Sequence, residues 1–87
     1  MAHTPHEPED LDAAVRAALA DVAPDLDPGT IELDADFHDD LGLDSMDTLN
    51  LAIALHEATG IDIPERDYPQ ITSISRCIAY LRGHPAS

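Results

Sequence analysis

The first regular pattern of apolar residues along the chain lies between positions 11 and 22. Apolar side chains recur there mostly three or four positions apart, the spacing that gathers them on one face of a helix. They are Leu11, Val15, Ala18, Leu19 and Val22. The pattern predicts a helix that starts at Glu9 or Asp10 and ends near Val22, because Pro24 cannot continue it.

A second helix is predicted over residues 45–59, with Gly60 as its C-cap. It is too apolar for one buried face. One arc, assigned to the core, holds Leu51, Ala52, Leu55 and Ala58 with Thr48 and Thr59. Another arc, beside Ser45, holds Met46, Leu49 and Ile53, with Asp47, Asn50 and Glu57 near its edge. A second apolar arc next to acids indicates a docking surface. The alternative is that both arcs pack inside.

The remaining apolar positions complete an all-α fold. Residues 61–64 are expected to be extended, and Pro64 begins a short helix that Pro69 stops. A last helix is capped by Thr72 or Ser73 and ends at Gly83. Its apolar positions are Ile74, Cys77, Ile78 and Leu81. We expect a small four-helix bundle of three main helices and one short one.

A long loop, residues 23–44, separates the first two main helices. Apolar residues along it are expected to pin it to the bundle: Ile31, Leu33, Phe37, Leu41 and Leu43. The ends of the chain are expected to be tails. The domain organisation is therefore a disordered tail over residues 1–8, one helical domain over residues 9–83 and a short tail over residues 84–87.

Charge narrows the possible partners. The chain has 4 Arg and no Lys against 18 Asp and Glu, a formal net charge of −14. Such a surface repels nucleic acid and anionic membranes, and it attracts basic protein surfaces. No apolar run is long enough to span a membrane, no signal peptide is recognisable, and a single cysteine, Cys77, allows no internal disulfide. These features favour a cytoplasmic monomer without membrane insertion.

Catalytic and metal chemistry fit the sequence poorly. His38 and Asp39 lie near Ser45, but one histidine in a loop does not imply a hydrolytic triad. A calcium loop that begins at Asp34 has Asp39 where glycine belongs and Ser45 in place of the final acid. The histidines and Cys77 have no zinc-ligand spacing. We therefore expect no enzyme activity, no catalytic residue and no metal site.

The stretch Asp40-Leu41-Gly42-Leu43-Asp44-Ser45-Met46 organises the rest of the chain. Gly42 reaches backbone angles that other residues avoid. Asp44 is a good N-cap that can accept the backbone N–H of Asp47, and the Asp47 carboxylate suits the positive end of the helix dipole. Ser45 is therefore expected at the first helical position with its hydroxyl outward, where a partner can reach it.

This stretch resembles the prosthetic-group attachment motif of acyl carrier proteins. Asp36-Phe37, residues 60–64 and residues 71–74 resemble the family's segments on either side, so the resemblance spans roughly residues 11–81. It implies that Ser45, with Asp44 and Gly42, forms the attachment site for 4′-phosphopantetheine. A phosphopantetheinyl transferase with Mg²⁺ would transfer the arm from coenzyme A, and the arm's thiol would hold acyl groups as thioesters.

The resemblance also implies partners. Asp44, Asp47 and Glu57 would meet basic residues of acyl-transfer, acyl-activating and condensing enzymes, while Met46 and Ile53 fill an apolar notch. Leu49 is expected to belong to the same partner-binding surface. Asn50 and His56 stand where many fatty-acid carriers have acids, and Ala58-Thr59 replaces a common acid–aromatic pair. These departures indicate a specialised freestanding carrier of fatty-acid, polyketide or related biosynthesis. The alternative is an unmodified acidic helical adaptor that binds basic protein surfaces.

Overall fold

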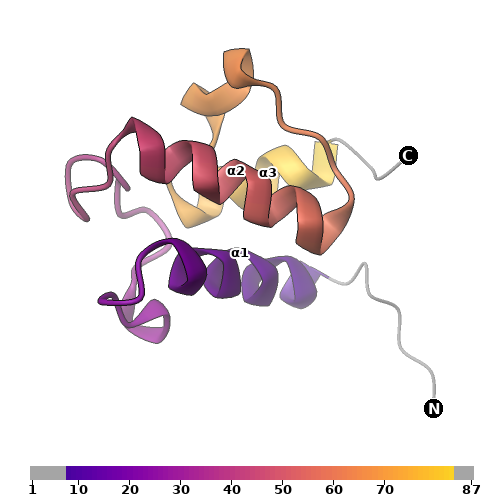
Figure 1. The fold of residues 1–87 in the computed structure, drawn as a ribbon. Helices are drawn as coiled ribbons and strands as arrows, with labels where there is room; N and C mark the ends of the chain where they lie inside the picture. Colours follow the sequence, from indigo (N-terminus) through magenta and orange to yellow (C-terminus); the bar gives the residue numbers. More distant parts are fainter. Residues whose placement is uncertain (1–7, 84–87) are drawn as a thin grey trace.

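The computed structural model describes residues 8–83, and within them every regular element is a helix (Figure 1). Three α-helices form the body: α1 (Pro8–Val22), α2 (Ser45–Thr59) and α3 (Ile74–Gly83). Two short 3₁₀ helices, η1 (Pro28–Thr30) and η2 (Glu65–Gln70), lie in the connections. The predicted all-α bundle of three main helices and one short helix is confirmed, and η1 is an additional turn inside the long loop.

Helix α1 begins one residue before the expected start. Its first residue is Pro8, a residue suited to the first helical position because its missing N–H has no intrahelical partner there. The predicted end at Val22 is confirmed, and Ala23 N–H still donates to Leu19 O at 2.8 Å before Pro24. The expected tails, Pro8 apart, lie outside the described residues.

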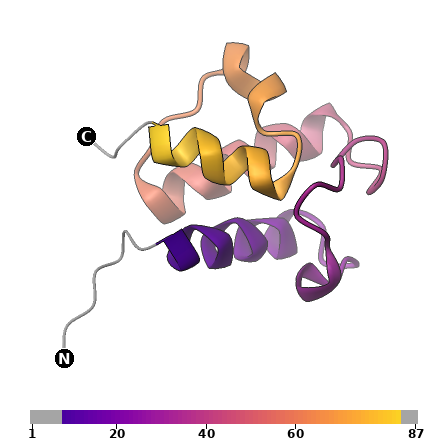
Figure 2. The same ribbon diagram turned by 180° about the vertical axis from the view of Figure 1, so that it is seen from behind.

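The core lies where α1 packs against both α2 and α3, and Figures 1 and 2 show the three helices from opposite sides. Its largest fully buried side chains come from all three helices and from the turn before α3. They are Val15, Leu19, Leu51, Leu55, Ile71, Ile74 and Cys77. Burial raises the pKa of the Cys77 thiol to about 12, so Cys77 serves as a small neutral core residue, as predicted.

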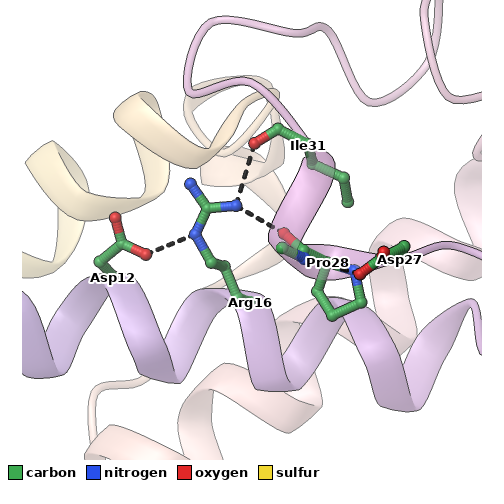
Figure 3. Close-up of polar contacts among 6 residues, drawn as sticks. Asp12, Arg16, Asp27, Pro28 and Ile31 are labelled. Carbon is green, nitrogen blue, oxygen red and sulfur yellow. Dashed lines mark hydrogen bonds and ion pairs between the residues drawn. The ribbon is translucent and has the colours of Figure 1, made fainter.

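Arg16 holds the start of the long loop against α1 (Figure 3). Its Nε pairs with Asp12, one turn earlier, and its Nη1 donates to the carbonyls of Pro28 at 2.5 Å and Ile31 at 2.9 Å. A guanidinium satisfies loop carbonyls with charge-assisted hydrogen bonds, which are stronger than neutral ones. One α1 side chain thus fixes both ends of η1.

Phe37 anchors the second half of the loop. Its ring is 4% exposed, its N–H donates to Thr72 O at 2.8 Å, and its carbonyl accepts Leu43 N–H at 2.9 Å. Near the start of α3, Ser75 N–H donates to Leu33 O at 2.9 Å. Ile31 and Leu43 are buried as well, and Leu41 is half-buried, so four of the five expected anchors reach the core side.

Three predictions of side-chain or helix placement are wrong. Leu33 is 46% exposed, because its backbone carbonyl, and not its side chain, ties the loop to α3. Ala58 is exposed, because the buried arc of α2 ends at Leu55. Pro69 lies inside η2 and does not stop it. Proline has no N–H to donate, and the hydrogen bonds on either side run from Asp67 N–H to Pro64 O and from Ile71 N–H to Tyr68 O, so neither needs a donor at position 69.

Tyr80 joins η2 to α3. Its ring is 4% exposed, and its hydroxyl donates to Asp67 Oδ2 at 2.6 Å. Burial, followed by the hydrogen bond to Asp67 and that carboxylate's charge, raises the pKa of Tyr80 to about 12. The phenol therefore stays protonated in the folded chain well above the pH at which it ionises in the unfolded chain.

This raised pKa predicts a loss of stability in alkali. Between pH 10 and pH 12 the unfolded chain releases the Tyr80 proton first, so ionisation favours unfolding; below pH 10 both states keep the proton. At pH 11 the effect is about 1 kcal/mol in the free energy of unfolding, since one pKa unit corresponds to about 1.4 kcal/mol. Urea denaturation at pH 9, 10 and 11 measures it. In Tyr80→Phe the free energy of unfolding should fall less between pH 9 and pH 11, by that amount. An equal fall in both proteins would contradict the assignment of this effect to Tyr80.

Candidate functional site

The start of α2 is fixed by a reciprocal cap. Asp47 N–H donates to Asp44 Oδ1 at 2.9 Å, and Asp44 N–H donates to Asp47 Oδ2 at 3.1 Å. Each carboxylate therefore satisfies a backbone donor of the other residue, as in the capping box of Ser/Thr and Glu. Asp44 itself is extended, with φ −101° and ψ −173°, and the helix begins at Ser45. The predicted N-cap and first helical residue are both observed.

Ser45 is exposed to solvent at the first position of α2, on the turn that this cap fixes. Its side chain is exposed, and its hydroxyl makes no hydrogen bond to any residue between positions 8 and 83. The backbone N–H groups of Ser45 and Met46 also have no acceptor within that range, as expected for the first turn of a helix. Two free N–H donors and the positive end of the helix dipole next to a free hydroxyl form a surface suited to a phosphate.

Gly42 shapes the approach to Ser45. It has φ +74°, in the left-handed region that favours glycine, and its N–H donates to His38 O at 3.1 Å. Apart from Gly42 itself and its two chain neighbours, no residue has an atom within 4 Å of the place where a Cβ would stand. The glycine is therefore needed for the backbone angle and not for lack of space. The left-handed conformation of Gly42 turns the chain, so that the next residue, Leu43, is buried and the one after it, Asp44, is exposed.

The loop before the cap contains a second capped turn that the sequence pattern did not reveal. Asp36 Oδ2 accepts the N–H groups of His38 at 3.0 Å and Asp39 at 2.7 Å, and Asp36 N–H donates to Asp40 Oδ2 at 2.8 Å. An aspartate side chain that accepts the backbone N–H of the residue two positions later forms an Asx turn. Asp36 was therefore the feature of the sequence that could have predicted this turn. The acids here are structural partners of the loop as well as surface charge.

His38 binds the backbone next to the cap. Its Nδ1 lies 3.0 Å from Leu43 O, one residue before Asp44. The pKa of His38 is raised above 6.5 by this hydrogen bond to Leu43, and the carboxylates of Asp39 and Asp36 act in the same direction. The imidazole is therefore hydrogen-bonded to the Leu43 carbonyl, and within residues 8–83 it makes no hydrogen bond to Ser45.

The second apolar arc of α2 is at the surface. Met46 is 62% exposed, Ile53 48% and Leu49 37%. Glu57 is also exposed, while Asp47 is half-buried in the cap. The alternative in which both arcs of α2 pack inside is therefore wrong. The structure brings these residues onto the helix that begins with Ser45; their role in binding partners stays a prediction.

Within residues 8–83, no three or more His, Cys, Asp or Glu side chains are arranged to hold a metal ion. None of the helices in this range is both long and apolar enough to cross a membrane.

Comparison with known proteins relates the chain to a protein family. A family model described as "Phosphopantetheine attachment site" matches residues 13–81, which is most of the chain and includes the capped turn. The chain is 41% identical over 59 residues to a mitochondrial acyl carrier protein of Neurospora crassa, covering 68% of this chain and 44% of that protein. It is 37% identical over 60 residues to mitochondrial acyl carrier protein 2 of Arabidopsis thaliana, covering 69% and 48%. The chain thus spans about half the length of these relatives.

These comparisons correct one expectation. The cytoplasmic location inferred from the sequence is contradicted, because both relatives bear the name of a mitochondrial protein. The inference rested on the lack of a membrane span and of a recognisable signal peptide. Neither feature distinguishes one aqueous compartment from another, which is why it misled.

Proposed function

The chain belongs to the acyl carrier protein family, and we propose that Ser45 is the serine that bears its 4′-phosphopantetheine arm. The observation that carries the proposal is the free Ser45 hydroxyl at the first position of a helix whose cap is fixed by Asp44 and Asp47. The thiol of the bound arm holds an acyl group as a thioester. Partner enzymes of fatty-acid, polyketide or related specialised biosynthesis would load it and use it.

The residues of this chain fit the phosphate of the arm. The N–H groups of Ser45 and Met46 are available to a phosphate oxygen, and the helix dipole favours negative charge there. Asp44 and Asp47 each accept a backbone N–H, which keeps their carboxylates in the cap. In the attachment reaction, Ser45 Oγ would form a bond to the phosphorus next to pantetheine as the phosphoanhydride bond of coenzyme A breaks, and adenosine 3′,5′-bisphosphate would leave. The serine proton would leave to a base of the transferase.

Partner docking is proposed on the α2 surface beside Ser45. The apolar part consists of Met46, Leu49 and Ile53, each more than a third exposed. Asp44 and Glu57 add exposed carboxylates on the same helix and its cap. Apolar anchors with a charged surround are typical of surfaces where a few buried contacts give affinity and the charges give orientation and speed of association.

Mass spectrometry tests the attachment. The full chain is incubated with coenzyme A, Mg²⁺ and a transferase of broad specificity, and we expect one phosphopantetheine to be added. Fragmentation should place the added mass on Ser45. An unchanged mass with several transferases would contradict the proposed function, and so would modification at a different serine. An unchanged mass would favour the unmodified adaptor.

Docking is tested by a charge placed in the apolar arc. We expect Ile53→Arg to lower kcat/KM of the transferase about 30-fold, because truncating or disrupting a central contact costs about 2 kcal/mol and each 1.4 kcal/mol is about tenfold. The melting temperature should change little, since Ile53 is 48% exposed. Ala58→Arg is the matched control, with the same added charge at an exposed position later in α2. Equal rates for the two variants would exclude the arc as the docking surface.

A further inference from the structure

A depression of about 490 Å³ lies beside η1, and no residue of the apolar arc of α2 lines it. Its apolar lining comes from Leu26, Ile31, Ala35 and Leu41, and the long loop alone supplies it. The depression shares no residue with the proposed attachment site or with the docking arc.

Carboxylates surround this apolar floor. They come from separated parts of the loop: Asp27, Glu32, Asp34 and Asp40. No Arg or Lys occurs between Arg16 and Arg66, and Arg16 is committed to Asp12 and to the carbonyls of Pro28 and Ile31 (Figure 3). No Arg or Lys of the loop itself therefore neutralises the rim.

The walls of the depression are held in place before anything binds. Asp27 Oδ1 accepts Gly29 N–H at 3.1 Å, Asp34 Oδ1 accepts the Ser75 hydroxyl at 2.9 Å, and Asp40 closes the turn on Asp36. Glu32, by contrast, makes no side-chain hydrogen bond to any residue in the described range. A preformed site loses less conformational entropy on binding than a flexible one.

We propose that this depression is a second docking surface that accepts an arginine side chain of a partner protein. The methylene stem would lie on Leu26 and Leu41, and the guanidinium would reach the rim, where planar carboxylate pairing favours arginine over lysine. A second copy of this chain is a poor occupant, since its net charge is −14. The surface is independent of the arm on Ser45, so failure of the attachment proposal would leave it standing.

The test uses the unmodified full chain and two short peptides. We titrate ¹⁵N-labelled protein with acetyl-Leu-Arg-Leu-amide and with acetyl-Leu-citrulline-Leu-amide, which has nearly the same shape without the charge. The arginine peptide should shift amide resonances within residues 26–41, and the citrulline peptide should bind about fivefold more weakly, which is the upper end of the range for an exposed ion pair. Equal binding of the two peptides would overturn the proposal. Shifts centred on α2 would overturn it as well.

Variants separate this site from general attraction to an acidic protein. Glu32→Gln should weaken binding of the arginine peptide about two- to fivefold, as expected for one exposed charge pair. Glu65→Gln, at an exposed position in η2, removes the same charge elsewhere and should leave binding unchanged. Ala35→Leu should fill the floor and abolish the shifts while the rest of the spectrum is kept. Equal weakening by both glutamine variants, or the same shifts with spermidine, would mean charge attraction alone and would overturn the proposal.

Discussion

Replacing Ser45 with alanine is expected to abolish addition of the phosphopantetheine arm while leaving the fold intact. The hydroxyl is the nucleophile in the proposed attachment, and alanine supplies none. The side chain is exposed and makes no hydrogen bond to residues 8–83, so the free energy of unfolding should change by less than about 0.5 kcal/mol. Intact mass after incubation with coenzyme A, Mg²⁺ and transferase measures the first effect, and urea denaturation measures the second.

Ser75→Ala is the matched control. Ser75 is half-buried, donates its hydroxyl to Asp34 and lies at the start of α3, so its loss should affect the loop but not the loading of the arm. If Ser75→Ala is fully loaded with the arm and Ser45→Ala is not loaded at all, Ser45 is the attachment site. Loading of Ser45→Ala to the native level would move the attachment to another serine and would end the present assignment.

The attachment turn could be predicted from sequence because its geometry is local. Asp44 caps a helix whose third residue is Asp47, and both partners of the cap lie within four consecutive residues. The exposed apolar arc was also predictable, because a helix with too many apolar positions for one buried face must expose some of them. Met46, Leu49 and Ile53 follow that rule.

The loop was less predictable because its ties join residues far apart in the sequence. Phe37 N–H bonds to Thr72 O, and Ser75 bonds to both Leu33 O and Asp34. Apolarity alone suggested that Leu33 would be buried, but a backbone bond fixes that residue and leaves its side chain outside. The depression beside η1 arises from the same long-range arrangement, and no periodic pattern indicates it.

Truncating Phe37 to alanine is expected to be among the most destabilising single changes in the chain. The ring is 4% exposed, and the backbone of the same residue joins Thr72, before α3, to Leu43, before α2. Removing a buried phenylalanine side chain costs about 3–5 kcal/mol, from lost apolar burial and from the cavity left behind. The total free energy of unfolding of a small domain is only about 5–15 kcal/mol, so this loss is a large share of it. Urea denaturation at neutral pH measures it.

Leu33→Ala gives the comparison that makes the Phe37 result informative. Both residues have large apolar side chains in the same loop, yet Leu33 is 46% exposed. Its truncation should therefore lower the free energy of unfolding by no more than about 0.5 kcal/mol. A partly unfolded Phe37→Ala chain should also load the arm more slowly, in proportion to the folded fraction, because Ser45 is presented only when Leu43 is held in the core. Equal stability of the two variants would show that the loop is not anchored through Phe37, and the capped turn of Ser45 would then need another support.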